Sequence, residues 1–125
     1  MTSNFVRELN IGNYIATKGG HLPYWRITKD DLVTILQSDK QEIYKPVRLT
    51  KKILKKFNFS PVKKDKSVYE DDNVYDGYST GYYFSTTNKI FYFDGEDIYS
   101  AVKIEYVHQF QNWYFLLTGK ELELK

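Results

Sequence analysis

The stretch from residue 105 to residue 119 decides the fold expected for this chain. It reads Glu105-Tyr106-Val107-His108-Gln109-Phe110-Gln111-Asn112-Trp113-Tyr114-Phe115-Leu116-Leu117-Thr118-Gly119. Six apolar side chains fall on one arc of about 120° of a helical wheel, which is typical of a helix packed on a sheet. These six are Tyr106, Val107, Phe110, Trp113, Tyr114 and Leu117.

We therefore predict a helix over Glu105–Thr118, with Phe110, Trp113 and Tyr114 as core residues. Gly119 is the expected C-terminal cap, because glycine adopts the left-handed conformation there at little cost. Phe115 and Leu116 lie off the buried arc. They predict either a second covering layer or an exposed apolar spot.

The residues before this helix have the pattern of short strands separated by polar turns. Strands at Tyr78–Phe84, Lys89–Phe93 and Ile98–Ile104 predict an antiparallel meander, with turns at 85–88 and at Asp94-Gly95. Near the N-terminus, Gly12-Asn13 indicates a turn into a first strand, and Gly19-Gly20 closes it into a hairpin. The strand that returns is expected at Pro23–Ile27.

Several segments are less clearly determined. Thr28 could cap a short helix, whereas the β-branched residues of Thr28–Leu36 favour a strand, and both alternatives stay open. Residues 63–76 are polar and charged, which predicts an exposed loop. Glu121–Leu124 alternates and could form an edge strand. The fold class predicted from these elements is α+β, in one domain that comprises residues 1–125.

A second helix is predicted at Leu49–Phe57, with Thr50 as its N-cap. Its buried face contains Ile53, Leu54 and Phe57, and the opposite face contains four lysines, Lys51, Lys52, Lys55 and Lys56. Asn58 can take the left-handed position that ends the helix. Pro61 then blocks its continuation.

The composition excludes several classes of protein. The chain has 125 residues, of which 22 are aromatic (12 Tyr, 8 Phe and 2 Trp), and it has no cysteine. Disulfide scaffolds, thiolate zinc sites and cysteine nucleophiles are therefore excluded. No run reaches the roughly 18 apolar residues of a membrane span, and residues 1–10 have no signal-peptide core. We expect a cytoplasmic protein.

The net charge of +2 hides a strong segregation of charge along the chain. Residues 45–66 contain a single acid and nine basic side chains, which we predict to bind a partner: Lys45, Arg48, Lys51, Lys52, Lys55, Lys56, Lys63, Lys64 and Lys66. Residues 67–97 contain seven acids against Lys89. Such a basic segment could neutralise phosphates, and the acidic segment could imitate them. Alternatively, the two segments face each other or lie solvated on separate faces.

No motif in the sequence identifies a catalytic, cofactor or metal site. Gly77-Tyr78-Ser79-Thr80-Gly81 matches the pattern of a nucleophile elbow, with His108 later in the chain, but an elbow joins a strand to a helix and here a strand follows. Residues 71–76 resemble half a calcium loop, yet Tyr75 occupies the fifth position and Tyr82 the twelfth. We expect His108 to form structural hydrogen bonds, and we expect no small-molecule substrate.

Three blocks of the sequence carry a resemblance to a known family. The stretch His108–Leu122 resembles the ending HQLQNLYFALTGEEL of small proteins without established activity, which phages, prophages and other mobile elements of Bacteroidetes carry. Leu9–Tyr14 resembles their opening LRIGN, and Pro46–Phe57 resembles their PIPLTEEILLKFGF. The blocks occur in the same order and cover about 35 of the 125 residues.

One departure from the family pattern bears on function. Lys51-Lys52 stands where the family usually has an acidic pair, and lysines oppose the dipole at a helix start by a few tenths of a kcal/mol each. A local rule broken without structural gain is a sign of selection for binding. The resemblance implies a mobile-element protein, and some anti-CRISPR proteins have this size and lack a catalytic signature.

The expected function is therefore non-enzymatic binding that inhibits a host defence effector. The basic face at 45–66 is the expected contact, with an RNA-guided CRISPR nuclease or its guide RNA as a reasonable target. The alternative is a nucleic-acid-binding phage accessory protein without a defence target, and a small enzyme of unknown reaction is the third class. Expected partners are a host protein, RNA or both.

Overall fold

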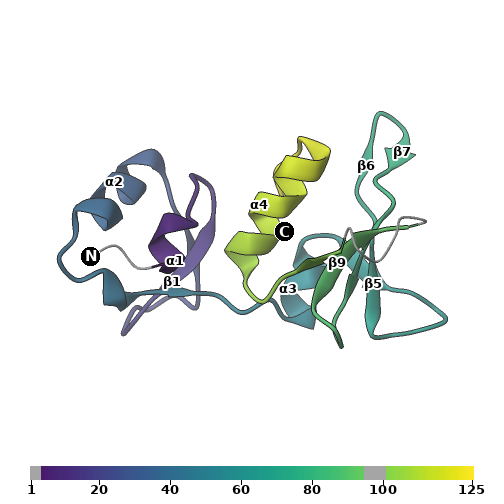
Figure 1. Cartoon of the computed structure of the whole chain (residues 1–125), viewed down its shortest axis with the longest axis horizontal. Helices are drawn as coiled ribbons and strands as arrows, with labels where there is room; N and C mark the ends of the chain where they lie inside the picture. The colour runs from purple at the N-terminus through teal and green to yellow at the C-terminus, as the bar shows by residue number, and fades with distance from the viewer. Residues whose placement is uncertain (1–3, 95–100) are drawn as a thin grey trace.

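A five-stranded antiparallel sheet forms the larger half of the molecule (Figure 1). The computed structural model describes residues 4–94 and 101–125. The strands are β4 (Phe59–Pro61), β5 (Val68–Asp71), β8 (Tyr82–Ser85), β9 (Ile90–Phe93) and β10 (Val102–Lys103), in the order β10-β9-β8-β5-β4. The predicted α+β class is confirmed, and β8, β9 and β10 form a meander, but the first predicted strand, Tyr78–Phe84, is divided into β7 (Tyr78–Ser79) and β8. Gly95 and Ile98–Ser100, which belong to the predicted turn and third strand, lie outside the described residues.

One face of this sheet builds the main hydrophobic core. Tyr69, Phe84 and Phe91 are buried on this face, and Phe84 pairs with both of the others in register. Helix α4 (Val107–Thr118) packs on this face through Phe110, whose ring lies 5.2 Å from Phe91 and 5.6 Å from Phe84 between centroids. Edge-to-face ring pairs of this kind stabilise a core beyond the area they bury.

The predicted buried arc of α4 is only partly correct. Phe110 and Tyr114 are fully buried, but Trp113 is 37% exposed and Leu117 is 44% exposed, so the assignment of Trp113 to the core is wrong. The helix is covered on two sides. The sheet covers Phe110 and Tyr114, whereas the N-terminal part of the chain covers the side that bears His108 and Gln111. The buried arc is therefore rotated away from Trp113.

The ends of α4 follow from local chemistry. The helix begins two residues later than predicted, because the side-chain oxygen of Gln109 accepts hydrogen bonds from the backbone N–H groups of Glu105 and Tyr106. Such a bond satisfies donors that the first turn of a helix leaves unpaired. Gly119 ends the helix with a φ of 74°, in the left-handed region, as predicted.

The N-terminal half has a sheet and a core of its own. Its elements are α1 (Asn4–Arg7), β1 (Tyr14–Thr17), β2 (Trp25–Arg26), α2 (Lys29–Gln37), the 3-10 turn η1 (Gln41–Ile43) and β3 (Tyr44–Pro46). The strands form an antiparallel sheet in the order β2-β1-β3, which confirms the hairpin. A separate cluster of buried residues fills this half: Val6, Leu9, Ile15, Ile27 and Ile35. Figure 1 shows α4 between the two sheets.

The structure decides the alternatives that the sequence left open. Residues after Thr28 form a helix, because the Thr28 hydroxyl accepts from the Asp31 backbone N–H while the Asp31 carboxylate accepts from the Thr28 N–H. This reciprocal capping box outweighs the strand preference of the β-branched residues. Residues 121–124 form no strand, although Leu122 is buried. None of the described helices is long and apolar enough to cross a membrane.

The prediction of an exposed loop over residues 63–76 is wrong. This stretch contains β5, the second strand from one edge of the large sheet, in which Tyr69 is 3% exposed and Asp71 is 6% exposed. It also contains β6 (Val74–Tyr75), which pairs with β7 (Tyr78–Ser79) in a small hairpin. The sequence did not indicate β5, because charged residues surround its buried positions. It also did not indicate that Asp71 is buried, because the hydrogen-bond partners of Asp71 include residues far away in the sequence.

Candidate binding surface

Helix α3 (Lys51–Lys56) presents a group of exposed cations. Thr50 caps it by accepting a hydrogen bond from the Ile53 N–H, and Asn58 ends it with a φ of 66°. Ile53, Leu54 and the following Phe57 are buried in the main core, as the sequence predicts. The helix therefore turns its remaining positions outward, and three of these are the exposed residues Lys51, Lys52 and Lys55.

These three lysines form no ion pair in the described part of the chain. The ion pairs found there join Arg26 to Glu121 and Glu123, and His108 to Glu8. The basic and acidic segments therefore do not neutralise each other among the described residues. Charges that the fold does not pair remain available to a partner in solution.

Two other basic side chains at or near α3, Lys56 and Arg48, contact aromatic rings. The Lys56 ammonium donates to the Tyr24 hydroxyl at 2.9 Å and lies 5.7 Å from the centre of that ring. The Arg48 guanidinium lies 5.7 Å from the centre of the Tyr106 ring. Lys45 is exposed on β3. Lys56 thus belongs to the contact between the two halves, which the sequence did not reveal.

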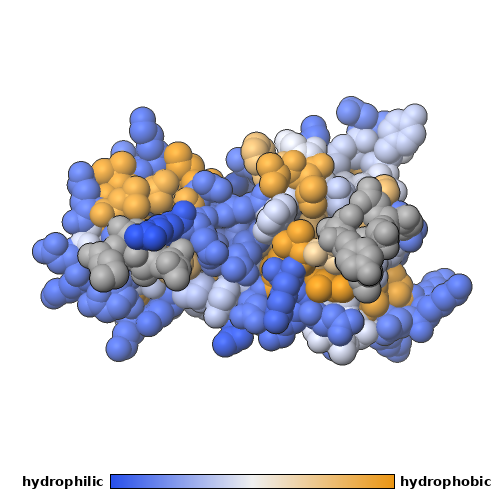
Figure 2. Space-filling model, in the orientation of Figure 1, coloured by the Kyte–Doolittle hydropathy of each residue, from blue (hydrophilic) through white to orange (hydrophobic). Residues whose placement is uncertain are grey.

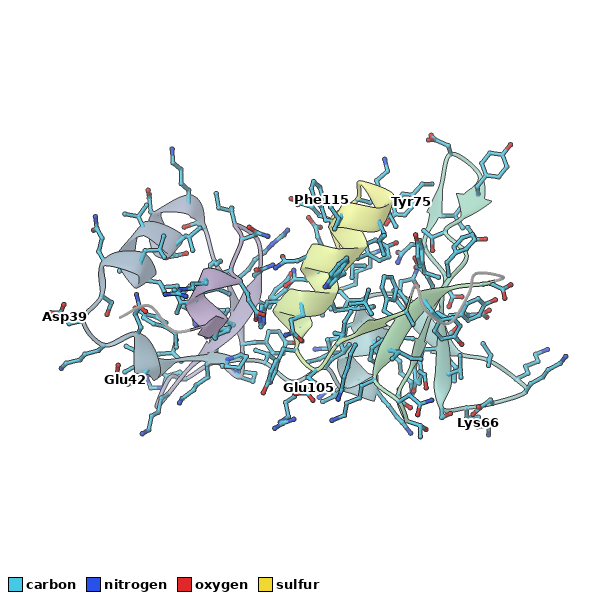
Figure 3. The ribbon with its side chains drawn as sticks, in the orientation of Figure 1. Asp39, Glu42, Lys66, Tyr75, Glu105 and Phe115 are labelled. Carbon is cyan, nitrogen blue, oxygen red and sulfur yellow. The ribbon has the colours of Figure 1, made fainter. Side chains whose placement is uncertain are left out.

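The nine predicted residues do not form one continuous surface. Lys63, Lys64 and Lys66 lie in the turn between β4 and β5, and Figure 3 shows Lys66 at the end of the molecule farthest from the N-terminal half. Helix α3 lies near the middle of the long axis (Figure 1). The sequence predicted four exposed lysines on α3, but Lys56 is half-buried, and it did not separate the cations of α3 from those of the turn between β4 and β5.

One cation beside α3 was missed by the sequence analysis. Lys89 lies in the turn between β8 and β9, and it lines a hollow together with Arg48 and Lys51. Lys89 stands inside the acidic segment of the sequence, about forty residues from α3. Nothing in the sequence indicates that Lys89 lies near α3, because only the pairing of the β-strands brings Lys89 and the helix together.

The acidic segment is also divided by the fold. Asp71 is buried and accepts hydrogen bonds from the hydroxyls of Tyr114 at 2.6 Å and Thr80 at 2.5 Å, and from the Asn73 backbone N–H at 2.9 Å. Burial raises the pKa of the Tyr114 hydroxyl far above its ordinary value, and the hydrogen bond to Asp71 raises it further. Asp71 therefore stabilises the core and cannot imitate a phosphate at the surface, whereas Asp72 and Asp76 are exposed.

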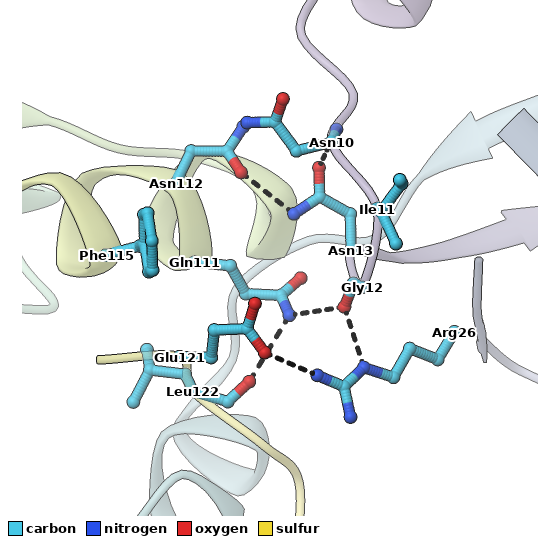
Figure 4. A pocket seen from close by; sticks show the side chains of 10 residues that line it. All are labelled: Asn10, Ile11, Gly12, Asn13, Arg26, Gln111, Asn112, Phe115, Glu121 and Leu122. Carbon is cyan, nitrogen blue, oxygen red and sulfur yellow. Dashed lines mark hydrogen bonds and ion pairs between the residues drawn. The ribbon is translucent and has the colours of Figure 1, made fainter. Parts of the chain in front are cut away.

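A hollow of about 230 Å³ lies between the N-terminal turn and α4 (Figure 4). The Gln111 side chain accepts from the Tyr14 N–H at 2.8 Å and donates to the Gly12 carbonyl at 3.0 Å. The Asn13 amide donates to the Asn112 side-chain oxygen at 2.9 Å, and the Asn112 amide donates to the Glu8 carbonyl. These amides are already used to join the two halves.

The three blocks that carry the family resemblance all meet at α4. Asn13, from the first block, bonds to Asn112 of the last block. In the middle block, the Leu49 N–H donates to the Glu105 carbonyl, and the Val47 carbonyl accepts from the Val107 N–H, just where α4 begins. The polar residues of the last block therefore help to hold the fold together, because Gln111 and Asn112 bond to the N-terminal part of the chain (Figure 4).

The residues of the apparent nucleophile elbow do not have the strand-to-helix geometry that this motif requires. Ser79 is exposed on β7 in a two-stranded hairpin rather than at a strand-to-helix turn. The His108 Nε2 lies 2.7 Å from the Glu8 carboxylate, which agrees with its predicted structural role. Burial lowers the pKa of His108, against the opposing effect of Glu8. Among the residues described, no group of His, Asp and Glu could hold a metal ion.

An exposed apolar stripe on α4 is a second candidate surface. Trp113, Leu116 and Leu117 are three and four residues apart, and Leu116 is 70% exposed. Figure 2 shows hydrophobic atoms gathered over the C-terminal turns of α4. The sequence left open whether Leu116 and Phe115 are covered, and both are exposed. Exposed apolar stripes of this kind are typical of protein interaction sites.

Comparison of this chain with models of protein families, with curated proteins and with solved structures finds no match.

Proposed function

We propose that this chain is a non-enzymatic binding protein of a mobile element, which inhibits a defence effector in the cytoplasm of its bacterial host. The proposed target is an RNA-guided CRISPR nuclease or its guide RNA. One observation carries the proposal: Lys51, Lys52 and Lys55 are exposed on α3 and form no ion pair among the described residues. The resemblance to mobile-element proteins supplies the biological setting.

The lysines at the start of α3 do not help the fold. A positive charge near a helix N-terminus is unfavourable by a few tenths of a kcal/mol, and the resembling family usually places acids at these two positions. Exposed charges contribute little to the free energy of unfolding. Lysines that slightly destabilise the helix and stabilise nothing else in the fold are expected where selection has favoured binding.

The apolar stripe of α4 supports a protein as part of the target. Trp113, Leu116 and Leu117 expose apolar surface to solvent, which a partner would remove from water on binding. An RNA-guided nuclease offers both protein surface and guide RNA, so it could contact a basic and an apolar surface of one small protein.

Affinity capture from the host, followed by identification of the retained proteins and RNA, tests this function. The parent is compared with the triple variant Lys51→Glu, Lys52→Glu, Lys55→Glu. A matched control changes three exposed lysines of the N-terminal half, Lys18, Lys29 and Lys40, to glutamate. We expect the parent and the control to retain the same defence effector and the α3 variant to lose it, most completely at low salt, where screening is weakest.

A plasmid-interference assay in the same host provides the functional readout. Expression of the parent or the control should restore plasmid uptake, and expression of the α3 variant should not. Retention of the same partner by all three proteins would rule out α3 as the contact surface. Capture of no defence component by the parent would contradict the function itself.

A further inference from the structure

A hollow of about 240 Å³ lies between the start of α3, the β8–β9 turn and the segment before α4. Its rim contains three cations, Arg48, Lys51 and Lys89. Its floor is apolar and includes the buried side chains of Phe84 and Ile104. A cationic rim over an apolar floor suits a ligand that has an anionic group beside a carbon ring.

The three cations are free to bind an anion. None of them forms an ion pair in the described ranges 4–94 and 101–125. The guanidinium of Arg48 is placed over the Tyr106 ring, at 5.7 Å from its centre, which leaves its N–H donors unused by any described acceptor. A guanidinium fixed in this way can bind a phosphate with two parallel hydrogen bonds, and a lysine adds a point charge.

A hydroxyl at the same rim adds a neutral donor. The Thr50 oxygen accepts a hydrogen bond from the Ile53 N–H, so its own hydrogen remains to be donated. Thr86 also lines the hollow, but its hydroxyl already donates to the Ser67 carbonyl at 2.7 Å. Thr50 is therefore the hydroxyl that could donate to an anion here.

The backbone at Lys89 adopts a conformation that lysine takes rarely. Lys89 has a φ of 57°, in the left-handed region that glycine and asparagine occupy far more readily than lysine. Its carbonyl accepts from the Ile104 N–H at 2.7 Å, which fixes the turn beside the hollow. Strained residues of this type cluster at ligand-binding sites.

One acidic side chain lines the hollow as well. Glu105 lies just before α4, as Figure 3 shows, and its carboxylate forms no ion pair with the three cations. A carboxylate repels a nearby anion, whether that anion is a peptide carboxylate or a phosphate. It is, however, a good acceptor for a sugar hydroxyl, and the 2′-hydroxyl is the group that distinguishes RNA from DNA.

We propose that this hollow binds one nucleotide unit of single-stranded RNA, with its phosphate on Arg48, Lys51 and Lys89 and its ribose hydroxyl on Glu105. Thr50 donates to the same phosphate, and the sugar lies over the apolar floor. Lys52 and Lys55 extend the positive surface along α3, so that phosphates of neighbouring nucleotides add to the affinity. The inference rests on the proposed function and specifies RNA as the part of the target bound here.

The test measures fluorescence anisotropy of labelled 12-residue single strands, oligouridine RNA and oligothymidine DNA, with the full chain across a salt series. The parent should bind RNA more tightly than DNA. Lys89→Gly removes a cation at a position that glycine suits, so the fold is retained. Its RNA affinity should fall roughly tenfold, the effect of losing one hydrogen bond to a charged group. Its salt slope should fall by about 0.7.

Two further variants make the test specific. Lys18→Ala removes an exposed lysine of the N-terminal half and should bind RNA as the parent does. Glu105→Ala should bind DNA more tightly and lose the preference for RNA. Any one of three results would overturn the inference. The parent and Lys89→Gly could bind RNA with equal affinity, the parent could bind RNA and DNA equally, or the parent could fail to bind RNA at low salt.

The same experiments separate this inference from the proposed function. If the parent binds no RNA, yet captures a defence effector that the α3 variant loses, the function stands and the contact is with protein. If the RNA results are as expected but no defence effector is captured, the hollow stands and the function fails.

Discussion

The buried carboxylate of Asp71 should be among the most sensitive positions for stability. Its side chain accepts hydrogen bonds from Tyr114, Thr80 and both the backbone and the side chain of Asn73. Replacing Asp71 by alanine leaves these donors without their acceptor in the core. A buried donor without a partner costs about 1–3 kcal/mol.

The magnitude follows from what each donor retains. The Tyr114 hydroxyl still lies 3.2 Å from the Tyr75 hydroxyl, and the Asn73 amide still donates to the Phe57 carbonyl at 3.0 Å. The half-buried Thr80 can turn to water. We therefore expect Asp71→Ala to lower the free energy of unfolding by about 3 kcal/mol, rather than by the full sum of several lost bonds.

A double-mutant cycle isolates the bond between Asp71 and Tyr114. Tyr114→Phe removes one donor to a charged acceptor and should cost about 1.5–2 kcal/mol. The double variant should cost less than the sum of the single changes, with a coupling energy of about 1–2 kcal/mol. The measurement is urea unfolding, followed by circular dichroism and analysed for midpoint and slope.

The neighbouring Asp72 is the matched control. It is exposed and accepts from the Ser60 hydroxyl, so Asp72→Ala should change stability by no more than about 0.5 kcal/mol. Equal unfolding midpoints for the Asp71 and Asp72 variants would refute the buried network. Additivity of Asp71→Ala and Tyr114→Phe would refute the direct bond between them.

Three further predictions follow from burial, backbone conformation and protonation. Phe110→Ala should cost about 3–5 kcal/mol in urea unfolding, and Trp113→Ala clearly less, because only Phe110 is fully buried; equal losses would contradict this packing. Gly81→Ala should destabilise by about 1–3 kcal/mol, since φ is 76° and the added Cβ would lie 2.8 Å from the Phe93 ring; an unchanged melting temperature would disprove this. Burial lowers the pKa of His108 below 6.5, so the unfolded chain binds the proton first, and stability should fall below pH 6.5 by up to about 1.4 kcal/mol per pH unit. Unfolding midpoints at pH 7.5 and pH 5 check this against His108→Gln, which should show a smaller decline; identical declines would assign the effect to other groups.

Features that depend on a few neighbouring residues could be predicted from the sequence. The cap at Thr50, the buried face of Ile53 and Leu54, and the end at Gly119 follow from helical spacing and from backbone preferences. The N-terminal hairpin follows from its turn residues. Exposure of Lys51, Lys52 and Lys55 follows from the same spacing, because a helix that buries one face turns the other toward water.

Other features depend on which segments lie next to one another in space. The sequence could not show which of these long-range contacts form. Helix α4 is apolar on more than one face, so spacing alone could not show that two layers cover it and leave Trp113 exposed. Asp71 is buried because donors nine and 43 positions away, Thr80 and Tyr114, satisfy it. Lys89 joins Arg48 and Lys51 only through the pairing of β8 with β9. Local periodicity determined the elements and their faces, whereas long-range pairing decided which faces are covered, because burial depends on partners from every part of the chain.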